Sequence, residues 1–181
     1  FVELNATRSA LEATGLREKL LDLEVPPRCN YIRTLMGELS RMSDHLTSIG
    51  AGCLEMGAMT PFLYCIEGRE LIWDLIEQTT GARLTVSYGR IGGVRDDLPE
   101  DFAENWEYTK ERIQNLHSDI DRLLSRNRVF MDRMQGTGAL TREMAIELGY
   151  TGPVGRSAGW DYDVRKDHPY FMYDEVDFEV P

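Results

Sequence analysis

Apolar side chains return every three or four residues along most of this chain, which is the spacing of an amphipathic α-helix. The longest such stripe runs from Ile32 to Ile49, and a second one runs from Phe102 to Leu124. Together with the residues that start and stop helices, the pattern predicts helices over residues 9–23, 28–56, 60–79, 102–124 and 141–148. The chain is therefore expected to be mainly α.

Prolines and glycines mark the expected helix ends. The pair Pro26-Pro27 separates the first two helices, because the residue before a proline is pushed out of the helical region. Thr60-Pro61 is typical of a helix start, and Gly81 lies where a C-terminal cap belongs. Inside the long helix, Gly50-Ala51-Gly52 either kinks the helix or lets another helix pack closely against it.

Two short stretches have strand character. Residues Leu84 to Tyr88 are rich in β-branched side chains, and apolar residues alternate with polar ones at the C-terminus, at Val176, Phe178 and Val180. We predict an antiparallel helix bundle with small β pieces, in a single domain over residues 1–181. Residues 17–149 form its helical core, and residues 150–181 form a tail rich in glycine, proline and aromatics that ends in a strand.

Composition excludes some functions. The chain has 181 residues and a formal net charge of −11, which argues against nucleic-acid binding because neutralising phosphates requires excess Lys and Arg. The sequence holds no apolar run of the roughly 18 residues that a membrane span requires. The chain begins at Phe1, so we expect it to be a piece of something larger.

The sequence offers little chemistry of its own. The three cysteines and the three histidines are scattered, no C-x-x-C is present, and so we expect this chain alone to hold no metal. Glu55 stands between Leu54 and Met56, where an apolar setting favours a raised pKa and proton chemistry; a solvated helix end is the alternative. The polar Asp44 and His45 are expected to be either exposed or engaged.

Several motifs in collinear order resemble the 49 kDa, or D, subunit of respiratory complex I over about residues 17–181. They include PPRCNYIR at 26–33, ELSRMSDHL at 38–46, LEMGAMTPF at 54–62, TGAR at 80–83 and RIGGVRDDLP at 90–99. Residues 1–16 match that family poorly. The resemblance implies the fold of the large subunit of nickel–iron hydrogenases, and the absence of C-x-x-C fits the loss of the nickel site.

The resemblance also implies a place in an assembly. The family member packs on a small subunit that carries the terminal iron–sulfur cluster, and together they form the chamber in which quinone is reduced. NADH and flavin bind other subunits, and the electrons drive proton or sodium pumping. The expected location is peripheral, on the cytoplasmic side of the bacterial inner membrane or the mitochondrial matrix side, with membrane contact through the complex only.

Carried over residue by residue, the resemblance places Glu55 where the family has an aspartate that communicates with a histidine near the quinone chamber. Glu55, together with His45 on the same long helix, is expected to belong to a proton path. Thr85 replaces a histidine that many members carry beside the terminal cluster, which would remove the proton-coupled titration of that cluster. No tyrosine stands near Glu3, where the family has its quinone tyrosine, and the histidine-bearing loop lies upstream of this chain. We expect the piece alone to bind quinone poorly.

The charged corner at residues 85–99 is expected to put Arg83, Tyr88 and Arg90 near the interface with the cluster-bearing subunit. A purely structural corner is the alternative. Two other classes stay open. One is a large subunit of a related membrane-bound hydrogenase; such proteins share the fold but less of the TPF and DLP motifs. The other is a non-catalytic assembly scaffold, which the missing tyrosine and Thr85 keep possible.

Overall fold

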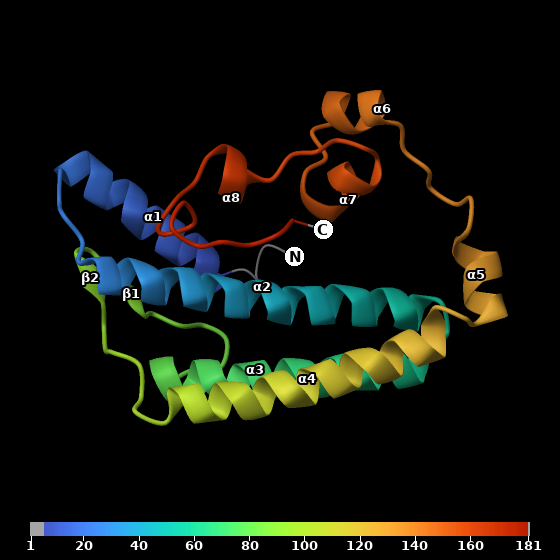
Figure 1. The fold of residues 1–181 in the computed structure, drawn as a ribbon, viewed down its shortest axis with the longest axis horizontal. Helices are drawn as coiled ribbons and strands as arrows, with labels where there is room; N and C mark the ends of the chain where they lie inside the picture. The colour runs from blue at the N-terminus through green and yellow to red at the C-terminus, as the bar shows by residue number, and fades with distance from the viewer. Residues whose placement is uncertain (1–5, 181) are drawn as a thin grey trace. The chain divides into compact units, whose positions relative to one another are not determined.

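The computed structural model describes residues 6–180, with the side chains of residue 11 and of residues 13–180. The position near Glu3, where the family tyrosine was expected, lies outside the described residues. The chain divides into two compact units, one that extends to Met131 and one that begins at Asp132 (Figure 1). Whether residues 1–181 act as the single expected domain stays a prediction.

Helices α1 (Ala6–Leu21), α2 (Pro27–Glu55), α3 (Met59–Thr80) and α4 (Phe102–Leu124) build the first unit. They confirm the predicted mainly α fold, with bounds that differ from the expected ones by a few residues. α3 packs against both α2 and α4, and the three run alternately up and down as a bundle (Figure 1). α1 packs on the N-terminal part of α2.

The helix ends follow the proline and glycine signals at most places. Pro27 is the first residue of α2, and Gly81 adopts the left-handed conformation with φ 80° while its N–H donates to the carbonyl of Glu77 at 2.7 Å. The prediction for the start of α3 is wrong, because Ala58 rather than Thr60 is the N-cap residue. Gly57, with φ 82°, turns the chain one residue before it.

Close packing explains the glycine at position 50. The helix α2 continues through Gly50, and a Cβ added there would lie 2.9 Å from the Cβ of Cys65 on α3. The second of the two alternatives, a close helix approach, is therefore the one that the structure supports. The buried apolar side chains of this unit are Leu11, Ile32, Met36, Leu39, Cys53, Cys65, Ile72, Leu75, Ile76, Tyr88, Phe102, Leu116 and Leu124.

The strand expected over residues 84–88 is wrong. Two-residue strands instead form on either side of the loop that follows, β1 (Gly89–Arg90) and β2 (Gly93–Val94), paired antiparallel with Arg90 opposite Gly93. Strand propensity is decided by pairing and burial, and Leu84 and Thr85 are exposed with no partner strand in the described part of the chain. The tight turn at Ile91-Gly92 brings residues 89–90 and 93–94 side by side, so each short strand is the pairing partner of the other.

The second unit consists of short helices and turns. α5 (Arg128–Met134) crosses its boundary, and α6 (Arg142–Glu147), α7 (Gly152–Ser157) and α8 (Val164–Asp167) follow. Thr141 caps α6 as predicted, because its hydroxyl accepts from the N–H of Met144 at 3.3 Å. The helices α5, α7 and α8 were not predicted, because they are too short to show an apolar period.

The predicted C-terminal strand is wrong. Turns occupy residues 171–175, and residues 177–180 have no paired strand among the described residues. Phe178 packs edge-on to Tyr173 with ring centroids 6.0 Å apart, and the guanidinium of Arg165 lies 4.8 Å from the centre of its ring. Side-chain packing therefore holds the segment where a ladder was expected. No helix among residues 6–180 is long and apolar enough to cross a membrane.

Candidate functional site

The charged corner of the sequence is the hairpin β1–β2, which lies beside the N-terminal end of α2 (Figure 1). Its two-residue loop is Ile91-Gly92, and Gly92 has φ 91°, a conformation that glycine adopts without steric cost. Arg90, Ile91 and Gly92 are exposed at the tip. The hairpin therefore presents a positive and an apolar side chain to the outside.

A buried ion pair fastens this hairpin to two helices. Arg33 of α2 is only 1% exposed, and its two terminal nitrogens each donate to one carboxylate oxygen of Glu18 of α1, both at 2.7 Å. The same guanidinium donates to the carbonyls of Arg90 at 2.9 Å and Gly93 at 2.7 Å. The carboxylate of Glu18 in turn accepts from the N–H of Gly92 at 2.6 Å. The backbone of the tip is thus bonded on both sides.

The two glycines that flank the loop let the backbone approach the helices. A Cβ added at Gly89 would lie 2.8 Å from Cδ2 of the buried Leu11, and one added at Gly93 would lie 3.2 Å from the sulfur of Cys29. A side chain at position 89 would therefore force a shift. Close approach to α1 and α2 is the reason for glycine at these two positions.

Tyr88 anchors the hairpin from inside. The side chain is 1% exposed, its hydroxyl donates to the carbonyl of Asp96 at 2.6 Å, and its carbonyl accepts from the N–H of Arg95 at 2.9 Å. Burial, followed by the nearby Asp97 and Asp96 carboxylates, raises the pKa of Tyr88 to about 12. The phenol therefore keeps its proton at neutral pH and serves as a hydrogen-bond donor.

Arg90 differs from the arginines around it. Arg28 donates three hydrogen bonds to Asp97 at 2.8–3.1 Å, and Arg95 pairs with Asp96 at 2.5 Å. Arg90 donates instead to the hydroxyl of Ser87 at 2.8 Å and to the carbonyl of Gly89 at 3.4 Å, both neutral groups. Among the described residues no carboxylate forms an ion pair with Arg90, although the chain carries 31 acidic and 20 basic side chains.

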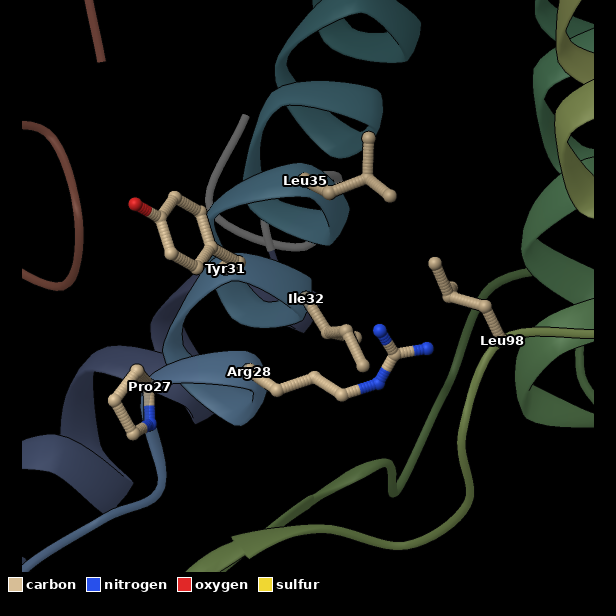
Figure 2. A pocket seen from close by; sticks show the side chains of 6 residues that line it. All are labelled: Pro27, Arg28, Tyr31, Ile32, Leu35 and Leu98. Atoms are coloured by element: carbon tan, nitrogen blue, oxygen red, sulfur yellow. The ribbon is translucent and has the colours of Figure 1, made fainter. Parts of the chain in front are cut away.

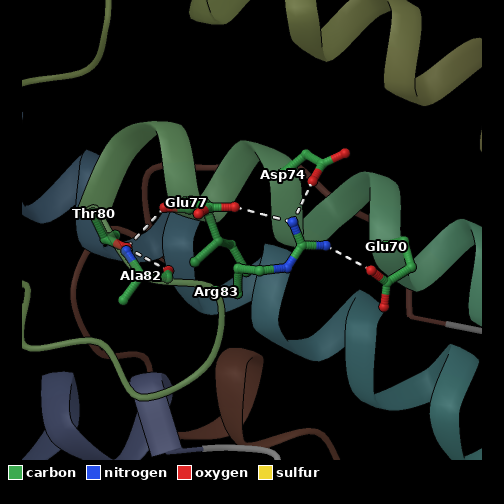
Figure 3. Close-up of polar contacts among 7 residues, drawn as sticks. Glu70, Asp74, Glu77, Thr80, Ala82 and Arg83 are labelled. Atoms are coloured by element: carbon green, nitrogen blue, oxygen red, sulfur yellow. Dashed lines mark hydrogen bonds and ion pairs between the residues drawn. The ribbon is translucent and has the colours of Figure 1, made fainter.

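Arg83 lies in a different setting, shown in Figure 3. Its guanidinium pairs with three acids on the last turns of α3, Glu70 at 2.6 Å, Asp74 at 2.7 Å and Glu77 at 3.0 Å. Thr80 holds the turn that follows, because its hydroxyl donates to the carbonyl of Ala82 at 2.9 Å. Hydrogen bonds from the guanidinium to Asp74 and Glu77, with a smaller contribution from the charge of Glu70, raise the pKa of Arg83 above its ordinary value. Three carboxylates neutralise the positive charge of Arg83, whereas the bonding partners of Arg90 are neutral groups.

Glu55 and His45 both lie on α2 and both are exposed. The two residues are ten positions apart, which corresponds to about 15 Å along a helix axis, so the structure does not bring the two side chains together. Glu55 is the last residue of α2, next to the turn at Gly57. Their assignment to a proton path stays a prediction, as does the effect of the exposed Thr85.

An open groove lies next to the hairpin, between the first turns of α2 and the segment after β2 (Figure 2). It has a volume of about 580 Å³ and is lined by Pro27, Arg28, Tyr31, Ile32, Leu35 and Leu98. Nothing among the described residues identifies an occupant. Within the same part of the chain, no group of three or more His, Cys, Asp or Glu side chains is arranged to hold a metal ion.

Sequence reasoning missed Glu18 and Arg33. Both stand within predicted amphipathic helices, where a charged residue must find a partner if it is buried. The available signal was the position of Arg33, which follows the buried Ile32 and precedes the buried Met36 on the same helix. A charged residue at such a position indicates a buried partner. The partners could not be read from the sequence, because Glu18 lies 15 residues from Arg33 and 74 residues from Gly92.

The described part of the chain is thus a mainly helical bundle whose best-defined polar feature is a rigidly held, positively charged hairpin. Residues 55–181 match the sequence model of the respiratory-chain NADH dehydrogenase 49 Kd subunit family. Because that match takes in more than half of the chain, the chain belongs to this family. The family resemblance of the motifs is confirmed.

Curated relatives agree with this assignment. The NADH-quinone oxidoreductase D subunit (number 2) of Anaeromyxobacter sp. (strain Fw109-5) is 48% identical over 181 residues, covering 98% of this chain and 42% of that protein. The D subunit of the same enzyme from Myxococcus xanthus (strain DK1622) is 49% identical over 164 residues, covering 91% of this chain and 40% of the relative. The D subunit (number 2) from Rhizobium meliloti (strain 1021) is 48% identical over 163 residues, or 90% and 40%. The chain spans about two-fifths of the length of these relatives.

Proposed function

We propose that this chain acts as part of the 49 kDa, or D, subunit of a proton-translocating NADH:quinone oxidoreductase, where it helps to form the quinone-reduction chamber beside the terminal iron–sulfur cluster. The relatives, which are named as D subunits of NADH-quinone oxidoreductase, support the complex. In this proposal the cluster is held by the small partner subunit, quinone is the substrate, and NADH and flavin bind other subunits. The complete 49 kDa protein has the fold of a hydrogenase large subunit and sits peripherally on the cytoplasmic side of the membrane.

The observation that carries the proposal is the state of Arg90. An exposed guanidinium on a rigid hairpin, bonded only to neutral groups among the side chains that the structure describes, is a suitable neighbour for an anionic group on another chain. A cluster that gains an electron becomes more negative, and a fixed positive charge nearby stabilises that reduced state. Ile91, exposed beside Arg90, adds an apolar contact of the kind that interfaces bury.

The other expected site residues take different parts in the proposal. Tyr88 holds the hairpin from inside, since its hydroxyl is bonded to the carbonyl of Asp96. Arg83, which three carboxylates surround, contributes less positive charge to an interface than Arg90 does. Glu55 and His45 belong to separate steps of the proton path, because they are not in contact.

The test is Arg90→Met in the full-length protein within the assembled complex. Loss of the charge makes the terminal cluster harder to reduce, so its midpoint potential falls. At an effective dielectric constant of about 20 and a separation of about 8 Å, Coulomb's law gives roughly 2 kcal/mol, or about 90 mV for one electron. Water and relaxation reduce the measured shift to about half of this or less. A redox titration followed by electron paramagnetic resonance measures it.

Two variants sharpen the result. Arg90→Lys retains the charge and should shift the midpoint less than Arg90→Met. Arg95→Met removes a charge from the same hairpin that Asp96 already neutralises, and should leave the midpoint close to its original value. An unchanged midpoint in Arg90→Met, in a complex that assembles normally, would mean that the hairpin does not face the cluster.

A further inference from the structure

The buried pair Glu18–Arg33 bonds to the backbone of Arg90, Gly92 and Gly93, which decides where the side chain of Arg90 points. We propose that Glu18 and Arg33 are positioning residues that fix the guanidinium of Arg90 relative to the partner subunit. This inference rests on the proposed role of Arg90 at the cluster-bearing subunit. It assigns a task to two side chains that the sequence motifs did not single out as site residues.

Geometry supports positioning over mere contact. One nitrogen of Arg33, Nη2, lies within 2.9 Å of three oxygens, which belong to Glu18, to the carbonyl of Arg90 and to the carbonyl of Gly93. The carboxylate of Glu18 completes the set by accepting from the N–H of Gly92. Side chains from two different helices therefore hold the backbone groups of one turn. A displacement of either helix side chain would move the tip.

Energetics point the same way. A buried ion pair often adds little net stability, because removing both charges from water costs about as much as their attraction returns. Apolar side chains of similar volume at positions 18 and 33 would fill the space but leave the carbonyls of Arg90 and Gly93 and the N–H of Gly92 unbonded by them. The charged side chains, unlike apolar ones, form hydrogen bonds that fix the position of the turn.

Arg90 depends on that backbone. Its side chain bonds to Ser87 and to the carbonyl of Gly89, which belong to the same short segment. Within the described residues, the Arg90 side chain makes no hydrogen bond to any helix. The side chain is exposed, and its base is fixed by the backbone that Arg33 and Glu18 hold. Loosening the tip therefore spreads the guanidinium over a larger volume and weakens its field at any one neighbouring group.

The experiment uses the full-length protein in the assembled complex, with Arg33→Lys, Glu18→Gln and the control Arg28→Lys. Lysine at 33 keeps the charge, but its side chain is one bond shorter and lacks the planar fork, so it cannot keep the two-pronged pair with Glu18 together with the bonds to both carbonyls. Arg28 is matched to Arg33, because it lies on the same helix and also bonds a carboxylate, but its partner Asp97 is on the surface. The two readouts are amide hydrogen exchange at residues 90–93 and the midpoint potential of the terminal cluster.

Arg33→Lys should speed exchange at Gly92 and Gly93 by at least about tenfold, as expected for the loss of charge-assisted hydrogen bonds. Arg28→Lys should leave the exchange unchanged. The midpoint should shift in Arg33→Lys in the same direction as in Arg90→Met, and the shift should vanish when Arg33→Lys is made in an Arg90→Met background. This non-additivity is what a purely structural role of Arg33 would not produce.

The outcomes separate the two proposals. Unchanged exchange at Gly92 in Arg33→Lys overturns the positioning role, whatever the result for Arg90. A midpoint that moves in Arg90→Met and stays put in both Arg33→Lys and Glu18→Gln also overturns it. A midpoint that does not move in Arg90→Met contradicts the proposed function instead, and exchange then decides the positioning role alone. Glu18→Gln keeps the shape of the side chain and removes its charge. If neither Arg33→Lys nor Glu18→Gln allowed the complex to assemble, the pair would be required for folding, and the positioning role would be overturned.

Discussion

The hydroxyl of Tyr88 offers a direct measurement of how firmly the hairpin is held. Tyr88→Phe removes one hydrogen bond, to the carbonyl of Asp96, and leaves the ring in place. We expect the free energy of unfolding to fall by about 1 kcal/mol, because the carbonyl loses its partner in a buried setting. Denaturant titration of the full-length protein measures the change.

The control for this variant is Tyr108→Phe, since Tyr108 on α4 is exposed and its change should be within about 0.5 kcal/mol of zero. The effect of Tyr88→Phe should not depend on pH between about 5 and 9, because the pKa of Tyr88 is raised to about 12 and the phenol stays neutral throughout. A pH-dependent difference would contradict the buried, protonated state.

Glu55 carries the proton prediction. Glu55→Gln keeps the size and the hydrogen-bonding capacity of the side chain and removes the ionisable proton. If Glu55 takes part in the proton path, quinone reduction by the assembled complex should slow by about 10²-fold or more while assembly survives. Steady-state NADH:quinone reductase activity across pH is the measurement.

Glu111→Gln is the matched control, because Glu111 is an exposed helical glutamate on α4. It should turn over at the original rate. Equal activity of Glu55→Gln and the control at every pH would mean that Glu55 is only a solvated residue at the end of α2. Its side chain is exposed, which agrees with that alternative.

At the scale of elements, the pair Gly50 and Gly52 tests the packing of α2 on α3. Gly50→Ala places a Cβ 2.9 Å from the Cβ of Cys65, so backbone must shift, and overpacking of this kind costs about 1–3 kcal/mol. Gly52→Ala meets nothing within 4 Å. It should stabilise the protein by about 0.5–1 kcal/mol, because alanine is the better helix former.

Thermal or denaturant unfolding of both variants in the same background measures this prediction. The sign is the decisive feature, since the two substitutions are chemically identical and lie two residues apart on one helix. If Gly50→Ala were to stabilise the protein as Gly52→Ala does, the close approach of α2 and α3 at this point would be contradicted.

The elements show which features a sequence can reveal. The helices of the first unit follow from apolar spacing and from local signals such as Gly81, because helices are held by contacts three and four residues away. The strand at 84–88 was predicted wrongly, since strand formation needs a partner that propensity does not supply. The short helices α7 and α8 had no periodicity long enough to detect.

The candidate site divides in the same way. Arg90 and the glycines of the loop could be picked out because a tight, charged turn is a local pattern. Glu18 and Arg33 could not be paired in advance, because their contact and their bonds to the loop join segments 15 and up to 74 residues apart. The family resemblance supplied a partner for Arg90, whereas only the structure supplied the reason why its backbone is held in place.

For the whole molecule, the two compact units each contain a carboxylate held by arginine. In the first, hydrogen bonds from Arg33 lower the pKa of Glu18 below its ordinary value of 4.5. In the second, hydrogen bonds from Arg165 lower the pKa of Asp163 to about 2, with Arg156 3.4 Å away. Both pKa values are depressed in the folded state, so the charged forms favour folding.

Acid is therefore expected to destabilise both units. The stability that each carboxylate adds is fully present above its unfolded pKa and is lost as pH falls through its folded pKa, about 2 for Asp163. The shift of the Asp163 pKa from 3.8 corresponds to about 2 kcal/mol. We expect the protein to be most stable above about pH 5 and to lose stability stepwise toward pH 2.

Amide hydrogen exchange, corrected for the intrinsic pH dependence of exchange, reads the two carboxylates separately. The N–H of Gly92 reports on Glu18, and the N–H of Arg165, which donates to Asp163 at 2.9 Å, reports on Asp163. Glu18→Gln should flatten the acid loss of protection at Gly92, and Asp163→Asn should flatten it at Arg165. Protection at Arg165 should persist down to about pH 2 in the unmodified protein, because Asp163 stays ionised to that point. Loss of protection at Arg165 already complete at pH 4 would show that the Asp163–Arg165 pair does not hold this part of the chain.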